Sequence, residues 1–387
     1  MLKLIANHSI LRLREILGEI GLAELMQSIR PTIPFENPWP RFQSLKERIT
    51  RLPQELQPLY RLLLLGEDVF VTEVSPSLER SLIHSLEDIG FLVSETEGSI
   101  RTNGYIVVPY DGFYFIADVP PVYPTHKKIK PDAYIDTDTL FLARMLPGRP
   151  KERVLDICTG AGLLAIVASA SAAAVIATDI NPLALNVARF NAILNGVDKK
   201  IAFNESDLFE TIARAPSQMI CANPPYLAVP QGIDKFVAGD GGEDGMRVVF
   251  SLLKGVNEYL APDGYALIMG GNYGDHTTPN TVAELRQIST DLRLKIDVFL
   301  LERMTIQHYA RSAVVNFDNP ALMLNKILEH GSTRNISHFY ILLLRVSKSF
   351  DGGHFRFFDG LVSLSQRAKE LRQINYERRE QDKRESS

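Results

Sequence analysis

The amino-acid sequence predicts an α/β protein, with a Rossmann-like doubly wound sheet preceded by a smaller α+β domain. From about residue 131 onward, short apolar runs alternate with segments whose apolar residues recur at helical spacing. One run, residues 219–222, is apolar throughout, as in parallel strands that helices cover on both faces. This alternation favours a mostly parallel sheet between two layers of helices.

The strands of the sheet are expected at residues 153–157, 174–179, 200–203, 218–222, 264–270, 295–301 and 338–346, with helices at 138–146, after the first strand, and at 182–195. Residues 302–337 form a long insertion before the last expected strand and are a candidate lid. The larger domain is therefore expected over residues 121–364, followed by a charged, solvated tail at 365–387.

A separate N-terminal domain is expected over residues 1–120. Helical patterns are present in 9–28, 43–65 and 75–89, and they precede short strands at 91–93, 99–101, 105–108 and 114–117. Helices followed by a small antiparallel sheet predict a winged-helix-like module. Fold analogy cannot assign DNA binding to such a module, so we interpret it as an accessory domain for substrate recognition.

The composition is that of an ordinary globular protein. The chain has 387 residues, 23% of them charged, and a net charge of −4, which gives no global reason to expect a nucleic-acid partner. Cys158 and Cys221 lie in apolar strand contexts, which indicates two buried free thiols in a reducing compartment rather than a disulfide pair. The eight histidines show no metal-ligand spacing. The apolar stretch 160–177 fits a loop, a helix and a strand better than a membrane span. A cytoplasmic protein without a metal ion is therefore expected.

A glycine-rich turn follows the first strand of the larger domain. Gly160, Gly162 and Ala165 fit the pattern G-x-G-x-x-A, and Asp179 stands 19 residues beyond Gly160 at the end of the next strand. An acid at that position can accept hydrogen bonds from both ribose hydroxyls. These residues alone fit a nicotinamide dinucleotide as well as other ligands that contain adenosine.

Two further acids argue against a dinucleotide. Asp156 precedes the glycines, where it would repel a pyrophosphate and suits a ligand with an ammonium and a sulfonium group. Asp207, followed by Leu208, comes after the third strand, where it can accept from an adenine amino group. For any single acid, a helix cap or an exposed turn is an equally ordinary explanation. Their order at successive strand ends favours the ligand.

The tetrapeptide Asn223-Pro224-Pro225-Tyr226 follows the buried run 219–222 and so is expected at the carboxyl end of a strand, where open α/β sheets bind ligands. Two prolines make a stiff turn that lacks N–H donors. Such a turn presents an amide side chain, free carbonyl groups and an aromatic ring. It is suited to holding a planar group that carries N–H donors. The alternative interpretation is an ordinary turn at the end of a strand, because Asn-Pro is a common start of turns.

The order of these motifs resembles that of class I S-adenosylmethionine-dependent methyltransferases, most closely the HemK-like branch typified by release-factor glutamine N5-methyltransferases. The likeness extends to Gly-Gly-Glu-Asp-Gly at 241–245, to Ala-Pro-Asp-Gly at 261–264 and to Thr-Asp-Thr-Leu at 137–140, which is similar to the branch's Thr-Glu-x-Leu; it covers roughly residues 130–300. The chain departs from the pattern at Cys158, where many methyltransferases have glycine. It also lacks the branch's Arg-Pro before the Thr-Glu segment, which weakens the transfer of the branch's protein substrate.

The resemblance implies S-adenosyl-L-methionine as the cofactor. It places Asp156 near the methionine part, Asp179 on the ribose, and Asp207 with Leu208 on the adenine. The residues implied for cofactor binding are Thr137, Asp156, Cys158, Thr159, Gly160, Gly162, Asp179, Ile180, Asn181, Asp207, Leu208 and Asn223. The residues implied for catalysis are Asn223, Pro224 and Tyr226, which would hold an acceptor nitrogen.

The methyl acceptor and the oligomeric state stay open at this point. A protein glutamine, a nucleic-acid amino group and a small metabolite with a nitrogen or oxygen acceptor all fit the tetrapeptide. A basic cluster at 127–130 points toward nucleic acid, although a solvated linker is its more ordinary interpretation, and the acidic net charge disfavours nucleic acid. A module that senses S-adenosylmethionine without catalysis is the alternative of a different class, and an intact tetrapeptide disfavours it.

Overall fold

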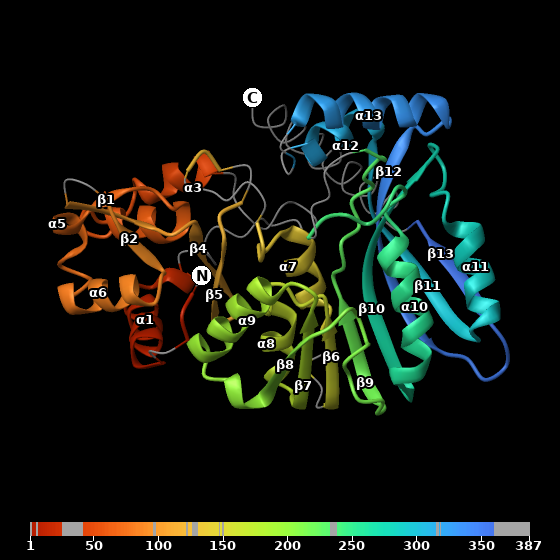
Figure 1. Cartoon of the computed structure of the whole chain (residues 1–387), viewed down its shortest axis with the longest axis horizontal. Helices are drawn as coiled ribbons and strands as arrows, with labels where there is room; N and C mark the ends of the chain where they lie inside the picture. The colour runs from red at the N-terminus through yellow and green to blue at the C-terminus, as the bar shows by residue number, and fades with distance from the viewer. Residues whose placement is uncertain are drawn as a thin grey trace, which may run out of the picture.

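The computed structural model of the chain describes residues 2–4, 7–24, 42–95, 98–120, 123–125, 131–146, 148, 151–232, 238–314, 317 and 319–359. The basic cluster at 127–130 and the charged tail at 365–387 lie outside the described residues. Figure 1 shows the small N-terminal elements on one side and the large sheet with its helices on the other. Within the described ranges, we find no helix long and apolar enough to cross a membrane.

An eight-stranded sheet organises the larger part of the chain, with the strand order β13-β11-β12-β10-β9-β6-β7-β8. Its strands are β6 (Lys151–Ile157), β7 (Ala172–Asp179), β8 (Ile201–Glu205), β9 (Ser217–Ala222), β10 (Leu260–Gly274), β11 (Leu294–Thr305), β12 (His338–Lys348) and β13 (His354–Phe358). The strands from β8 to β10 are parallel, whereas β12 runs antiparallel to both β10 and β11. The predicted doubly wound sheet is confirmed.

The two faces of the sheet follow from the alternation of side chains along each strand. In β6, Val154 packs in one hydrophobic cluster and its neighbour Leu155 packs in the other. The first cluster also holds apolar residues of α7 (Thr137–Arg144), α8 (Leu163–Ser169) and α9 (Pro182–Leu194). The second holds those of α10 (Arg247–Tyr259) and α11 (Val282–Asp291). Because both faces are covered, the central strands bury apolar side chains on both faces.

The direction of winding reverses between β6 and β9, since β7 and β8 lie on one side of β6 and β10 lies beyond β9. Chains that leave these two strands at their carboxyl ends turn in opposite directions and leave a crevice between them. The glycine-rich turn follows β6 and the tetrapeptide follows β9. The sheet topology therefore brings the two motifs to one place.

The N-terminal elements form a helical layer and two small sheets rather than the single small sheet expected from the sequence. The helices are α1 (Asn7–Glu19), α3 (Phe42–Ile49), α4 (Gln57–Tyr60), a π-helical turn (Arg61–Leu65), α5 (Val71–Val74) and α6 (Arg80–Asp88). One sheet has the order β1-β3-β2, from Val69–Phe70, Ser99–Thr102 and Leu92–Ser94. The other is the hairpin of β4 (Tyr105–Tyr110) and β5 (Phe113–Asp118). The winged-helix interpretation and the domain boundary at residue 120 stay predictions.

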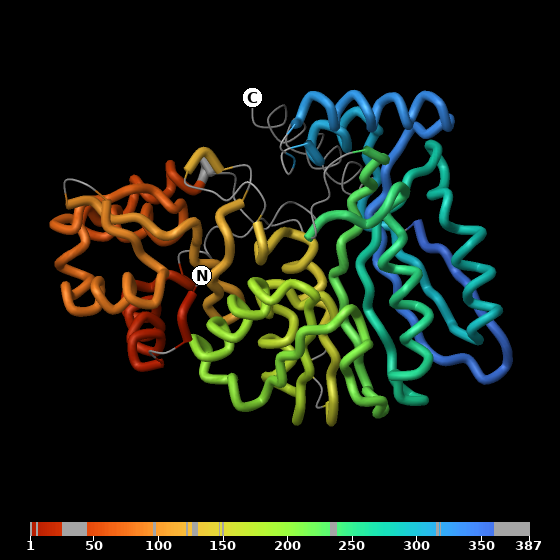
Figure 2. Tube along the Cα trace, viewed as in Figure 1, coloured from red at the N-terminus to blue at the C-terminus, as the bar shows by residue number. Residues whose placement is uncertain are grey.

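Two asparagines, Asn191 in α9 and Asn195 at its C-cap, explain why the hairpin separates from the first sheet. The fully buried Asn191 donates to the carbonyl oxygen of Ile116 at 2.8 Å and accepts from the same residue's N–H at 2.7 Å. Asn195 pairs in the same way with Tyr114, at 2.6 and 3.0 Å. These side chains act as a substitute strand for the outer edge of β5, and Figure 2 shows the hairpin between the N-terminal elements and α9.

The predicted insertion at 302–337 contains two helices, α12 (Ile306–Ala313) and α13 (Pro320–Thr333). The sequence expectation ended β11 too early, because this strand continues to Thr305, and it missed β13, which follows β12. In Figure 1 both helices lie above the upper ends of β10 and β12. Their apolar residues form a third cluster with Tyr273 and Phe339, and Tyr226 packs against it. The insertion thus covers the end of the sheet that carries the tetrapeptide; whether it moves as a lid stays a prediction.

Candidate functional site

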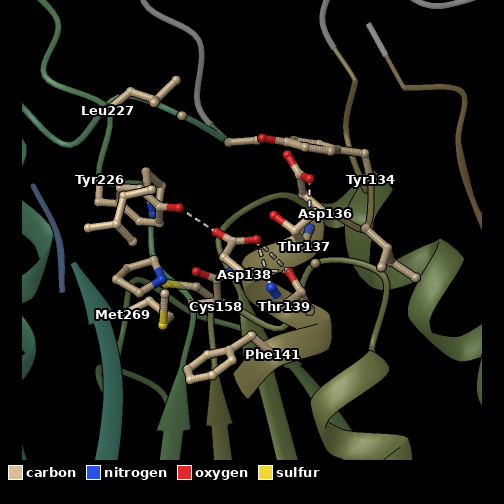
Figure 3. Close-up of a pocket in the computed structure, with 18 of the residues that line it drawn as sticks. Tyr134, Asp136, Thr137, Asp138, Thr139, Phe141, Cys158, Tyr226, Leu227 and Met269 are labelled. Atoms are coloured by element: carbon tan, nitrogen blue, oxygen red, sulfur yellow. Dashed lines mark hydrogen bonds between the residues drawn. The ribbon is translucent and has the colours of Figure 1, made fainter. Parts of the chain in front are cut away.

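A cavity of about 500 Å³ lies at the carboxyl ends of β6, β7 and β9. Ligand sites in α/β proteins have volumes of this order. Its wall is formed by the segments 132–139, 158–161, 179–181, 223–227 and 301–302 together with Met304 and side chains of α12 and β12. Figure 3 shows Thr137, Cys158 and Tyr226 around one opening, from three segments far apart in the sequence. The glycine-rich turn after β6, the segment 179–181 after β7 and the tetrapeptide after β9 therefore line a single cavity.

Asp156 does not line the cavity, although the resemblance implies a contact with the cofactor. Its side chain is fully buried, and Oδ2 accepts from the hydroxyl of Thr159 at 2.6 Å and from the N–H of Ala165 at 2.9 Å. Burial raises the pKa of this carboxyl to about 7, against the effect of these two hydrogen bonds. In this structure, Asp156 shapes the glycine-rich turn from behind.

The glycine-rich turn exposes backbone to the cavity. Cys158 has φ +61° and Gly160 φ +55°, so both residues adopt the left-handed conformation that favours glycine. A Cβ built at Gly160 meets no atom within 4 Å, which leaves room for a ligand against that backbone. Gly162 has another role: a Cβ there would stand 3.0 Å from the Cβ of Ala188, so its absence allows α8 to approach α9.

Asp179 and Asn181 lie beside that turn. Asp179 accepts from the N–H of Gly160 at 2.8 Å and from the N–H of Asn181 at 2.9 Å, and Asn181 caps α9 by accepting from Leu183 at 3.0 Å. Burial raises the pKa of the Asp179 carboxyl despite these donors. Together with Ile180 and Thr159, these residues line the cavity. Their contact with a ribose stays a prediction.

Asp207 and Leu208 do not line the cavity, although the sequence places an adenine there. Asp207 is exposed, and Leu208 is half-buried with φ +49°, its carbonyl oxygen accepting from Thr178 at 3.3 Å. Both still follow β8, next to β7, and the charge of Asp207 contributes to the raised pKa of the Cys158 thiol, after burial, Asp179 and Asp156. Adenine recognition by these residues stays a prediction.

The tetrapeptide is fixed from the opposite side by the first turn of α7. The side-chain nitrogen Nδ2 of Asn223 donates to Oγ1 of Thr139 at 2.8 Å, and the hydroxyl of Tyr226 donates to Oδ2 of Asp138 at 2.6 Å. Burial, followed by the charge of Asp138, holds the pKa of the Tyr226 phenol well above its usual range. The side-chain oxygen Oδ1 of Asn223 is buried and has no hydrogen-bond partner among the described residues. An acceptor atom without a donor is thus left at the cavity wall.

Glycines behind the tetrapeptide explain why the segment 241–245 accompanies it. A Cβ at Gly241 would stand 2.6 Å from Cα of Tyr226, and one at Gly245 would stand 2.6 Å from its carbonyl oxygen. A Cβ at Gly271 in β10 would stand 2.7 Å from the ring of Tyr226. The segment is paired with the tetrapeptide's exit by hydrogen bonds between Leu227 and residues 239 and 241. Backbone therefore packs directly on backbone here.

The sequence expectation named few of the residues on the far wall. Asp136 caps α7 by accepting from the N–H of Thr137 at 2.6 Å, and burial, then the charge of Asp138, raises its pKa. Tyr309 of α12 stacks on Phe339 with ring centroids 3.9 Å apart, and both line the cavity. The Thr-Asp-Thr-Leu segment was the available signal for the α7 residues, whereas no sequence pattern pointed to Tyr309 or Phe339.

Comparison with known proteins identifies the class to which these features belong. Residues 125–270 match the family model of the methyltransferase small domain. The chain is 33% identical over 177 residues to a putative protein N5-glutamine methyltransferase of Methanocaldococcus jannaschii, covering 44% of this chain and 88% of that protein. It is 40% identical over 123 residues to the ribosomal protein uL3 glutamine methyltransferase of Bradyrhizobium diazoefficiens, covering 29% of this chain and 39% of that protein. It is 35% identical over 163 residues to the release factor glutamine methyltransferase of Deinococcus radiodurans, covering 40% of this chain and 56% of that protein.

Solved structures give weaker overall similarity. A ribosomal protein L11 methylase from Lactobacillus delbrueckii subsp. bulgaricus aligns with a TM-score of 0.33 and 20% identity, covering 55% of this chain and 80% of that chain. Trm5b from Pyrococcus abyssi aligns with a TM-score of 0.39 and 16% identity, covering 76% and 78%. At these scores, the sheet topology and the sequence relatives carry the assignment.

Proposed function

Because the chain belongs to the HemK-like branch of the class I S-adenosylmethionine-dependent methyltransferases, we propose that it methylates the side-chain amide nitrogen of a protein glutamine. The cofactor of this family is S-adenosylmethionine. The matched region spans less than two thirds of the uL3 and release factor enzymes. Their substrates alone therefore do not identify the acceptor of this chain, and the residues of the site supply the further support. The relatives named for glutamine methylation support a protein acceptor.

The observation that carries the proposal is the unpartnered oxygen of Asn223. Its Nδ2 is held by Thr139 at 2.8 Å, so the amide plane is anchored, while Oδ1 stays buried without a donor from the part of the chain that the structure describes. Leaving a buried acceptor unsatisfied costs about 1–3 kcal/mol, which a bound N–H group would recover. An acceptor with an NH₂ group, such as a glutamine side chain, supplies that donor.

The residues of the cavity fit S-adenosylmethionine. Space against the backbone of Gly160 admits a ligand where a side chain would block it, and Asp179 stands beside it with carboxylate oxygens for ribose hydroxyls. Thr137 and Cys158 complete this wall. When bound, the cofactor supplies an electrophilic methyl group on a sulfonium. The acidic lining suits that positive charge.

The chain's own part in the reaction is to hold the acceptor nitrogen and polarise it. An amide nitrogen is a poor nucleophile because its lone pair is delocalised into the carbonyl group. Oδ1 of Asn223 and the carbonyl oxygen of Pro224 can accept its N–H bonds, which favours the positive charge that develops as the nitrogen pyramidalises. Neither proline carries an N–H that would compete for these oxygens. The fixed ring of Tyr226 limits the acceptor's orientation.

The charge of the cavity wall favours a protein acceptor over a nucleic acid. Five acids line the cavity, namely Asp132, Asp136, Asp138, Asp179 and Glu302, and Arg144 is the only base among its described lining residues. Nucleic-acid binding draws most of its affinity from neutralising phosphates with basic residues. A neutral glutamine in a peptide avoids the repulsion that a phosphodiester would meet at this wall.

Methyl transfer into separated cell fractions tests the proposal. The wild-type chain and an Asn223→Ala variant are incubated with methyl-labelled S-adenosylmethionine and an extract from cells that lack the gene, which is then separated into protein, RNA, DNA and small molecules. We expect label in the protein fraction with the wild type only, and equal affinity of both chains for S-adenosylhomocysteine. Label confined to RNA, DNA or small molecules would refute a protein acceptor.

A further inference from the structure

One carboxylate at the start of α7 links both ends of the tetrapeptide. Oδ2 of Asp138 accepts from the hydroxyl of Tyr226 at 2.6 Å. Its other oxygen, Oδ1, accepts from the N–H of Thr139 at 2.7 Å and meets the hydroxyl of Thr139 at 3.5 Å. The oxygen of that hydroxyl in turn accepts from Nδ2 of Asn223 at 2.8 Å. Figure 3 shows the side chains of Asp138, Thr139 and Tyr226 turned toward one another.

The donors and acceptors in this chain of contacts impose a direction. A carboxylate can only accept hydrogen bonds, whereas a hydroxyl has a single hydrogen to donate. When the Thr139 hydroxyl directs its hydrogen toward Asp138, its oxygen is left to accept. It therefore favours the NH₂ end of the Asn223 amide over the carbonyl end. The two ends of an amide have nearly the same shape, so hydrogen bonding decides which end faces Thr139.

We propose that Asp138, acting through Thr139, is a positioning residue that fixes which end of the Asn223 amide faces the methyl acceptor. The inference rests on the function proposed above, in which Oδ1 of Asn223 accepts from the acceptor nitrogen. A reversed amide would present its own N–H groups to those of the acceptor, so two donors would face each other. The direction of the amide thereby selects an acceptor that carries N–H donors.

Two pairs of substitutions separate this role from general support of the fold. Thr139→Val removes the hydroxyl and keeps the branched shape, whereas Thr139→Ser keeps the hydroxyl. Asp138→Asn replaces an obligate acceptor by an amide that can still accept from Tyr226 and can also donate. Asp198→Asn removes an exposed carboxylate in the 3₁₀ turn Asp198–Lys200 and serves as the charge-matched control.

We expect Thr139→Val and Asp138→Asn each to lower kcat by about tenfold to a hundredfold, the range for a misdirected polar group in an active site. The affinity for S-adenosylhomocysteine and the melting temperature should change little, and Thr139→Ser should recover most of kcat. Because both residues act through one chain of contacts, the double variant should be no slower than the slower single variant. Losses that multiply in the double variant, or a normal kcat in either single variant, would overturn the proposal.

The side-chain amide signal of Asn223 gives a readout that needs no acceptor. In a two-dimensional ¹H–¹⁵N spectrum it is identified as the NH₂ pair that is lost in Asn223→Ala. We expect this pair to shift in Thr139→Val and in Asp138→Asn and to stay in place in Thr139→Ser and Asp198→Asn. If the wild type labels no protein, the proposed function fails while this spectrum still decides the present inference. An unshifted pair in both Thr139→Val and Asp138→Asn overturns it.

Discussion

Gly241 offers a steric test of how the tetrapeptide is held. In a Gly241→Ala variant, the new Cβ would lie 2.6 Å from Cα of Tyr226 and 2.7 Å from the carbonyl oxygen of Gly245. Ordinary contact begins at 3.4 Å, so the Tyr226 backbone or the loop has to retreat by the difference, 0.8 Å. Both neighbours are backbone atoms, and no flexible side-chain end can move in their place. Gly241 does not have a left-handed φ, so alanine adds volume without backbone strain.

The consequences of this displacement differ between stability and activity. Forcing a methyl group into packed structure costs about 1–3 kcal/mol of unfolding free energy. A displacement of about 1 Å at a reacting group can reduce the rate by about a hundredfold. The residues expected to bind the cofactor follow other strands, so the affinity of the variant for S-adenosylhomocysteine should change little. We therefore expect a large loss in kcat with a modest loss in stability.

The assay combines labelled methyl transfer, calorimetric titration with S-adenosylhomocysteine and urea denaturation. Gly18→Ala is the matched control, because Gly18 is an exposed residue of α1 with no atom within 4 Å of a built Cβ. That variant should keep wild-type activity and gain about 0.5–1 kcal/mol of stability. A wild-type rate in Gly241→Ala, or a loss of cofactor affinity as large as the loss of rate, would refute the reasoning.

Three further changes test other parts of the structure. Asn191→Ala should lower the unfolding free energy by about 3 kcal/mol or more in urea denaturation, because it strips partners from the buried backbone of Ile116 and Ala161; a loss below about 1 kcal/mol would show that this contact matters little. Burial raises the pKa of Asp156 to about 7, above the value of about 3.9 in unfolded chains, so its contribution to stability is present below about pH 4 and is lost as the pH rises to about 7. The stability of Asp156→Asn relative to wild type should therefore be greater at pH 8 than at pH 5, and a pH-independent difference would contradict the raised pKa. Cys158→Gly should retain S-adenosylhomocysteine affinity and unfold no more easily by calorimetry, because glycine adopts φ +61° without strain; a weaker affinity would assign the thiol a role in binding.

Local patterns in the sequence predicted the large sheet because each strand and helix carries its own periodicity. The strands that it missed are short or lie at an edge of a sheet. The strand β13 is an edge strand with alternating exposed positions, and β1 has only two residues. The separation of the β4–β5 hairpin from the other small sheet depends on Asn191 and Asn195, about 75–81 residues away along the chain.

Sequence order placed the candidate residues at strand ends but did not determine where their side chains point. Asp156 turns behind the glycine-rich turn because Thr159 and the N–H of Ala165 supply donors there, while Asp179 stays at the cavity. The partners of Asn223 and Tyr226 come from α7, more than 80 residues earlier in the chain. Only the resemblance of the Thr-Asp-Thr-Leu segment hinted at that contact.

The most direct test of the central claim is to locate the transferred methyl group. Proteins methylated by the wild-type chain in the extract are digested, and tandem mass spectrometry assigns the modified residue and atom. We expect a methyl group on the side-chain nitrogen of glutamine with the wild type, and none with an Asn223→Ala variant that still binds S-adenosylhomocysteine. A methyl group on another residue type, or an equal yield from the Asn223→Ala variant, would contradict the assignment of Asn223 as the group that holds the acceptor amide.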